Sequence, residues 1–199
     1  MLFRSPPAVL GEHALLTAWR RDLHRHPELG YEEHRTSAFV AHELRALGLD
    51  VHTGIGRTGV VGTLRRGSGH RAIGLRADMD ALAMQELSDI PHRSVHDGKF
   101  HGCGHDGHTI MLLAAARTLA REGRFDGTVH FIFQPAEEGG AGGAAMIADG
   151  LFERFPVSAV FGMHNDPMRP VGHFGMKPGP MMAAAQMFEI TVHGRGGHA

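Results

Sequence analysis

The sequence predicts an α/β protein, a doubly wound and mostly parallel sheet flanked by helices. Apolar segments typical of strands alternate along the chain with segments whose apolar residues recur at helical spacing. Several strand segments run directly into acidic residues or histidine, and open α/β sheets place their ligands at such strand ends. With 199 residues, the chain is long enough for one core but short for two complete domains.

The first third of the chain is predicted to form two helices and then two strands. Residues 11–26 and 32–47 repeat apolar side chains on one helical face, and a proline or a glycine follows each segment. Residues 50–53 and 59–64 have the short apolar or β-branched pattern of strands. This part of the chain should therefore supply helices and strands of one layered core.

The remainder is predicted to alternate strands with helices. The strands are expected at 71–77, 127–133 and 157–163, and the helices at about 106–120 and 143–149. A Pro/Gly segment then precedes an alternating strand at 186–193, which has no evident partner, and isolated strands are unstable. We therefore expect one domain over 1–183 and the truncated beginning of a second over 184–199.

Composition argues against a nucleic-acid-binding protein and against a membrane protein. The formal net charge is −1 and no basic block is present, which argues against a nucleic-acid partner. No apolar stretch is long enough to span a bilayer, and the N-terminus lacks the pattern of a signal peptide, so no membrane association is expected. A single cysteine cannot form an internal disulfide, which fits a cytoplasmic location.

The only cysteine lies in a glycine-rich stretch, His101-Gly102-Cys103-Gly104-His105-Asp106-Gly107-His108, at the start of a predicted helix. Side chains two residues apart in extended backbone share one side, so Cys103 and His105 can converge on one point. A thiolate and an imidazole there suit a soft or borderline divalent metal. Two alternatives remain open at this point: an inert buried cysteine, and a cysteine nucleophile paired with His105.

Three predicted strands end in further candidate ligands. Asp78 and Asp80 follow the first, Glu137 and Glu138 the second, and His164 the third. Neighbouring glutamates diverge, so one can bind a metal while the other acts as a general base; the alternative is a solvated turn before the next helix. The carboxyl ends of parallel strands share one edge of the sheet, so these groups are expected to meet.

Five motifs in order resemble those of the N-acyl-amino-acid amidohydrolases. This is the hippuricase and auxin-conjugate hydrolase branch of the aminoacylase/carboxypeptidase metallopeptidases. The matching segments are Arg76-Ala77-Asp78-Met79-Asp80-Ala81-Leu82, Cys103-Gly104-His105-Asp106-Gly107-His108, Phe133-Gln134-Pro135-Ala136-Glu137-Glu138-Gly139, Gly162-Met163-His164-Asn165 and Gly196-Gly197-His198-Ala199.

The resemblance implies a catalytic α/β domain that holds two divalent ions, with 1–183 as its N-terminal portion. It implies Zn²⁺ or Mn²⁺ as the ions, with Co²⁺ or Ni²⁺ also compatible with the donor set. The metal ligands would be Cys103, His105, Glu138 and His164. Asp80 would orient one of these ligands from behind.

The resemblance also implies a role for the end of the chain. Residues 184–199 would begin an inserted α+β lid domain that mediates formation of a homodimer. His198 would reach the partner's active site and stabilise the tetrahedral intermediate, and Glu137 would be the general base. Relatives supply a further histidine ligand from near their C-terminus, and it is expected to be missing from this chain.

The reaction implied is metal-dependent hydrolysis of the amide bond of N-acyl amino acids, hippurate-like or N-acetylated. Glu137 would take a proton from a metal-activated water and pass it to the leaving amine. The alternative is a truncated, catalytically inactive metal-binding fragment of such an enzyme. A third hypothesis is a cysteine hydrolase that uses Cys103 and His105.

Overall fold

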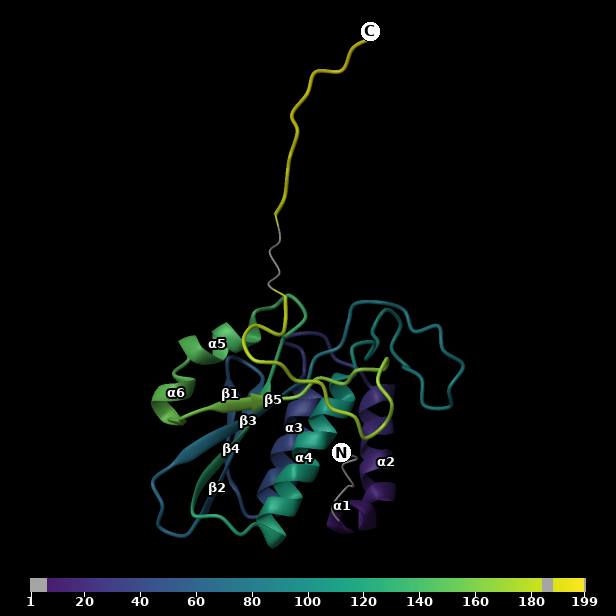
Figure 1. The fold of residues 1–199 in the computed structure, drawn as a ribbon. Coiled ribbons are helices and arrows are strands. Elements are labelled where there is room, and N and C mark those ends of the chain that lie inside the picture. Colours follow the sequence, from purple (N-terminus) through teal and green to yellow (C-terminus); the bar gives the residue numbers. More distant parts are fainter. Residues whose placement is uncertain (1–6, 184–187, 199) are drawn as a thin grey trace. The chain divides into compact units, whose positions relative to one another are not determined.

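The computed structural model describes residues 7–183 and 188–198. Its helices and strands all lie in one compact unit, Ser5–Asp166, and the residues from Pro167 onward belong to a second unit. The elements, shown in Figure 1, are α1 (Pro7–Gly11), α2 (His13–Arg25), α3 (His34–Ala46), β1 (Asp50–Ile55), β2 (Gly59–Arg66), β3 (Ala72–Asp78), α4 (His105–Glu122), β4 (Gly127–Gln134), α5 (Gly142–Ala148), α6 (Leu151–Arg154) and β5 (Val160–Gly162).

The strands form one sheet in the order β1-β2-β4-β3-β5. β4 and β5 both pair with β3 in parallel, whereas β2 pairs antiparallel with both β1 and β4. The described sheet is therefore mixed rather than mostly parallel. Only a three-residue turn joins β1 to β2, and a connection that short requires antiparallel strands.

Helices cover both faces of this sheet, as the prediction of a doubly wound α/β fold requires (Figure 1). Side chains alternate between the faces along β4, so Phe131 and Phe133 pack on the side of α2, α3 and α4. Ile132 packs on the opposite side, against Met146 of α5 and Leu151 of α6. Each fully buried phenylalanine contributes roughly 2–3 kcal/mol through removal of apolar surface from water.

Helix α4 crosses the first of these faces and brings its N-terminus to the carboxyl end of β3. Leu113 and Ala116 are buried in the same cluster as Phe131. Gly104 precedes the helix with a φ of 90°, in the left-handed region that glycine adopts readily. The turn at Gly104 lets the chain change direction between Cys103 and His105.

The last two predicted strands differ from expectation: one is shorter, and the other is not formed over the described residues 188–193. β5 covers only Val160–Gly162 of the range 157–163 and is an edge strand that pairs with β3 alone among the described strands, and its Phe161 is 56% exposed. The strand expected at 186–193 is not formed over 188–193, where no described residue pairs with it. Residues 186–187 lie outside the described part of the chain. No helix within 7–183 or 188–198 combines the length and apolar character needed to cross a bilayer.

Candidate metal centre

Three strand exits meet at one edge of the sheet, as the sequence predicts. The parallel register places Asp78 opposite Gln134, and Arg76 opposite Gly162. The three strands therefore end side by side. Asp80 follows β3, Glu137 and Glu138 follow β4, and His164 follows β5. The N-terminus of α4 reaches this edge as well, because α4 packs against β3.

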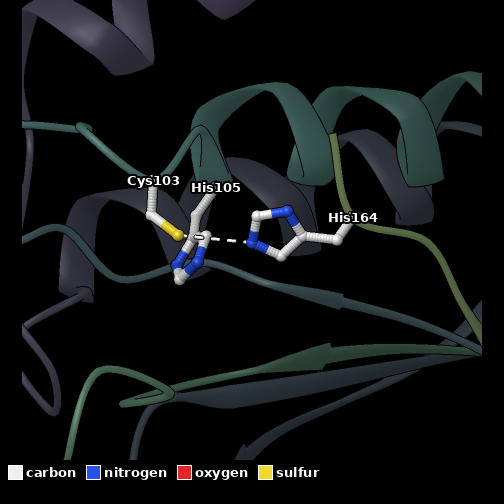
Figure 2. Close-up of side chains that lie close together, drawn as sticks. All are labelled: Cys103, His105 and His164. Atoms are coloured by element: carbon white, nitrogen blue, oxygen red, sulfur yellow. Dashed lines mark hydrogen bonds between the residues drawn. The ribbon is translucent and has the colours of Figure 1, made fainter. Parts of the chain in front are cut away.

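Cys103 and His164 lie beside each other although they are 61 residues apart (Figure 2). The Sγ atom of Cys103 is 3.3 Å from Nε2 of His164. The other ring nitrogen, Nδ1, lies 2.7 Å from the carbonyl oxygen of Asn165, which can only accept a hydrogen bond. Nδ1 therefore carries the proton of the neutral ring, and the lone pair of Nε2 faces the sulfur.

The close approach of these segments depends on Gly104. A Cβ atom at this position would lie 2.6 Å from the Oδ1 atom of Asn165, closer than two such atoms can pack. A side chain at position 104 would therefore displace the side chain of Asn165.

His105 lies at the centre of the site, with its side chain fully buried. Its Nδ1 atom is 3.3 Å from a carboxylate oxygen of Asp80. Its Nε2 atom has no hydrogen-bond partner among the described residues, although carboxylate oxygens of Asp78, Glu137 and Glu138 lie 3.7–3.9 Å away. A buried nitrogen that carboxylates surround without bonding it is where a cation fits.

The surroundings of His105 favour positive charge. Burial lowers the pKa of its imidazole, but the hydrogen bond to Asp80 and the charge of Asp78 raise it by more, so the net shift is upward. Burial likewise opposes ionisation of Asp80, but hydrogen bonds from His105 and from the backbone of Glu138 hold its pKa below the usual range. The site thus contains the low-pKa carboxyls of Asp78 and Asp80 beside an imidazole whose Nε2 atom lacks a hydrogen-bond partner among the described residues.

Two further residues lie in the site, Asp78, expected only as a candidate at a strand end, and His108, to which the sequence assigned no role. Asp78 accepts hydrogen bonds from His108 Nδ1 at 2.6 Å and from Arg76 at 2.8 Å. Burial raises the pKa of Asp78, but the bond from His108 and the charges of His105 and Arg76 lower it to about 2. His108 lies three residues after His105, so helical spacing alone could have placed it on the same face.

His108 links Asp78 to the segment that carries His164. Its Nε2 atom accepts the backbone N–H of Asn165 at 3.0 Å, and its ring centroid lies 4.6 Å from that of His164. The Oδ1 atom of Asn165 also lies within hydrogen-bond reach of Nε2, so both the backbone and the side chain of Asn165 contact this ring. His108 therefore orients the loop after β5 from the face of α4.

Within the described part of the chain, the donor atoms fall into three groups that could hold a metal ion, and His105 belongs to all of them. The groups are Cys103, His105 and His164; Asp78, His105 and His108; and His105, Glu137 and Glu138. Within each group the donor atoms lie within 4.8 Å of one another. Sulfur, imidazole and carboxylate donors together suit a borderline transition metal such as zinc.

The thiol of Cys103 is unlike an activated nucleophile. Burial raises its pKa first, and the hydrogen bond and charge of Glu138 raise it further, to about 12. Catalytic cysteines have depressed pKa values because cations or helix dipoles stabilise the thiolate. The hypothesis of a cysteine hydrolase therefore has no support in this geometry.

The remaining candidate, His198, lies in the second unit, in an exposed stretch without helix or strand. Its role stays a prediction. By contrast, His24 in α2 is buried and hydrogen-bonds to Asp106 at 2.8 Å and Glu86 at 3.2 Å. His24 thus holds the first turn of α4 next to His105 and belongs to none of the three donor groups.

Known proteins share both the sequence and this fold. Residues 74–198 match the model of peptidase family M20/M25/M40. The hippurate hydrolase of Campylobacter jejuni is 47% identical over 192 residues, which are 96% of this chain and 50% of that protein. The N-acetylcysteine deacetylase of Bacillus subtilis is 42% identical over 94% of this chain and 49% of its own length. This chain thus spans about half the length of these relatives.

A solved structure agrees with the sequence comparison. The crystal structure of the Bacillus subtilis YXEP protein, a dinuclear metal binding peptidase of the M20 family, superposes with a TM-score of 0.81 at 40% identity. The match covers 86% of this chain and 48% of that one. The resemblance read from five short motifs thus extends over the described fold, and the chain belongs to peptidase family M20/M25/M40.

Proposed function

We propose that the complete protein hydrolyses the amide bond of N-acyl amino acids, hippurate-like or N-acetylated, with two divalent metal ions. The observation that carries the proposal is the unpaired Nε2 atom of His105, placed between a sulfur–imidazole group and a carboxylate group. The hippurate hydrolase and the N-acetylcysteine deacetylase among the relatives favour this substrate class.

In this proposal four residues hold the ions: Cys103, His105, Glu138 and His164. The tautomers support the assignment, because His105 and His164 each direct the proton on Nδ1 toward an oxygen and leave Nε2 as a donor to metal. The donor set fits Zn²⁺ or Mn²⁺, and also Co²⁺ or Ni²⁺. When bound, such ions polarise a scissile carbonyl and lower the pKa of water toward about 7.

The two glutamates take different roles. The side chain of Glu137 is 42% exposed and that of Glu138 is 26% exposed, so Glu137 has the freer access to water and substrate. Glu137 accepts the proton of the attacking water and delivers it to the leaving amine. The backbone N–H of Glu138 donates to Asp80. This bond fixes the peptide unit of Glu138 and therefore the direction of the Glu138 side chain.

His198 completes the proposed reaction from the partner subunit of a homodimer. It would donate a hydrogen bond to the oxyanion of the tetrahedral intermediate, and loss of one such donor costs about 10²–10³ in rate. Residues 184–199 would begin the lid that carries it, and 1–183 would be the N-terminal portion of the catalytic domain. We further propose a cytoplasmic protein that acts on small molecules and contacts neither nucleic acid nor membrane.

The test is hydrolysis of hippurate and of N-acetyl amino acids by the full-length protein, before and after removal of metal with a chelator. We expect turnover that chelation abolishes and that Zn²⁺ or Mn²⁺ restores. Turnover that survives complete removal of metal would overturn the proposal. The alternative, an inactive metal-binding fragment, is not favoured by the hydrolase relatives, and the metal content of this chain beside a C-terminally extended form separates the two.

A further inference from the structure

The turn that carries Glu137 and Glu138 has an unfavourable backbone. Ala136 has a φ of 47° and Ala141 a φ of 52°, so a residue with a Cβ atom adopts the left-handed region on each side of the two glutamates. Ala136 is also completely buried. Such conformations cost free energy and persist only where the surrounding structure imposes them. Contacts from outside the turn must therefore hold it in place.

Glu33 makes the first of these contacts. Its side chain is fully buried, one carboxylate oxygen accepts the backbone N–H of Ala136 at 2.8 Å, and the other accepts the hydroxyl of Thr58 at 2.5 Å. No ion pair to Glu33 is formed within the described residues. A buried carboxylate without a cation is costly, so both oxygens need these hydrogen bonds.

The hydrogen bond from Ala136 to Glu33 is not part of the capping of helix α3. Glu33 precedes α3, where a side chain usually caps the helix, yet its side chain makes no such bond. Glu28 caps the helix instead, because its oxygens accept the backbone N–H groups of Arg35 at 2.9 Å and Thr36 at 2.8 Å. The carboxylate of Glu33 is left to hold the turn.

A second contact reaches the other side of the two glutamates. The hydroxyl of Tyr31 donates to the carbonyl oxygen of Gly140 at 2.6 Å, and the guanidinium of Arg57 lies 4.2 Å from the centre of the Tyr31 ring. Gly30 packs directly on the turn, since a Cβ atom there would lie 2.9 Å from the Cβ atom of Ala136. Residues 30–33 thus contact the turn both before and after Glu137 and Glu138.

We infer that Glu33 is a positioning residue that fixes the backbone of this turn, with Tyr31 as its second contact, so that both glutamate side chains stay aimed at the metal centre. The inference rests on the proposed function insofar as Glu137 is the base and Glu138 a ligand. Glu33 itself touches no ligand and no reacting atom; it acts through the peptide N–H of Ala136.

The experiment compares four forms of the chain: wild type, Glu33→Leu, Glu33→Gln and Glu28→Ala. Zn²⁺ affinity is measured by calorimetry, and hydrogen exchange of the Ala136 amide is measured in the metal-free chain. Glu33→Leu should weaken Zn²⁺ binding by about 10–100-fold, the usual effect of losing an orienting partner. It should also speed exchange at Ala136. Glu33→Gln keeps one acceptor oxygen and should restore most of both properties.

Glu28→Ala is the matched control. It removes the cap of α3 and should lower the free energy of unfolding without changing Zn²⁺ affinity or exchange at Ala136. If Glu33→Leu does not fold, Tyr31→Phe decides, because it removes only the hydroxyl that bonds Gly140. A folded Glu33→Leu, or in its place Tyr31→Phe, that binds Zn²⁺ and exchanges as wild type does would overturn the inference.

The two proposals fail separately. If the wild-type protein binds Zn²⁺ but hydrolyses no N-acyl amino acid, the proposed function is wrong and the affinity comparison still decides the role of Glu33. If the wild-type chain binds no Zn²⁺, exchange at Ala136 in the metal-free variants decides it. In the active full-length protein, Glu33→Leu should lower kcat more than it changes KM.

Discussion

Asp80 joins the two halves of the candidate site through the backbone of Glu138. One oxygen of the Asp80 carboxylate accepts the Glu138 N–H at 2.9 Å, across 58 residues of sequence, and the other lies 3.3 Å from Nδ1 of His105. The carboxylate therefore sets the orientation of an imidazole and of a peptide unit at once. A substitution at Asp80 should therefore disturb both the ring of His105 and the peptide unit of Glu138.

Asp80→Asn tests this relationship. The amide keeps one acceptor but presents an N–H₂ group to a donor, so either the bond to His105 or the bond to Glu138 is lost. We expect Zn²⁺ affinity to fall by about 10–100-fold, measured by calorimetry. Asp126→Asn is the control, since Asp126 also accepts two backbone N–H groups, those of Ser68 and Gly69, in a distant loop. Unchanged affinity in Asp80→Asn would contradict the role.

Substitutions of Glu137 and Glu138 in the full-length protein should affect turnover and metal binding differently. Glu137→Gln removes the proposed base but not a ligand, so turnover should fall by about 10²–10⁴-fold while metal content is retained. Glu138→Ala removes a ligand and should lower metal content, as measured by elemental analysis. Near-normal turnover of Glu137→Gln would refute the assignment of the base.

We expect His108 to support Zn²⁺ affinity without being a metal ligand itself. His108→Phe keeps a ring of similar size but removes the acceptor for the Asn165 N–H and the donor to Asp78. The loop with His164 then loses its support, and Zn²⁺ affinity should fall by about tenfold. His130→Phe is the control, because His130 is also buried and hydrogen-bonded but contacts Thr63 within the sheet. Equal losses in both variants would show a general effect on the fold instead.

Glu12 should make stability depend on pH. Hydrogen bonds from Arg117 lower its pKa from 4.5 to about 2, helped by Arg121 and opposed by burial. A carboxyl whose pKa is depressed on folding stabilises the protein above pH 4.5, and this contribution is lost as pH falls toward 2. The pair is partly exposed, so we expect on the order of 1 kcal/mol.

The measurement is urea unfolding of wild type and Glu12→Gln at pH 7 and pH 3. Wild type should be the more stable at pH 7, and the difference should shrink at pH 3. Glu122→Gln, at the exposed end of α4, controls for the loss of one negative charge. A difference that does not change with pH would mean that the ion pair with Arg117 adds nothing.

The sequence predicted those features that local patterns encode. The spacing of apolar residues located α2, α3 and α4 and the strands β1 to β4, and the strand exits identified the edge where Asp80, Glu138 and His164 meet. The mixed strand directions of the sheet were missed, because the direction of β2 depends on a turn length and on a partner strand 61 residues or more away.

The supporting residues were harder to predict. Glu33 reaches Ala136 across 103 residues, and nothing in the sequence around Glu33 distinguishes it from an ordinary helix cap. Asp78 was noticed only as one of two acids after a strand, and its partner His108 only as part of a motif. Contacts of this kind are set by how the elements pack, which periodicity does not report.

The shortness of β5 has a thermodynamic consequence. Three residues pair this edge strand to β3, yet the chain continues from it directly to His164. Any local opening of this edge would separate His164 from Cys103. An ion that binds only to the paired form draws the equilibrium toward it by mass action. A metal ion held by Cys103 and His164 would therefore stabilise this edge of the sheet as well as the site.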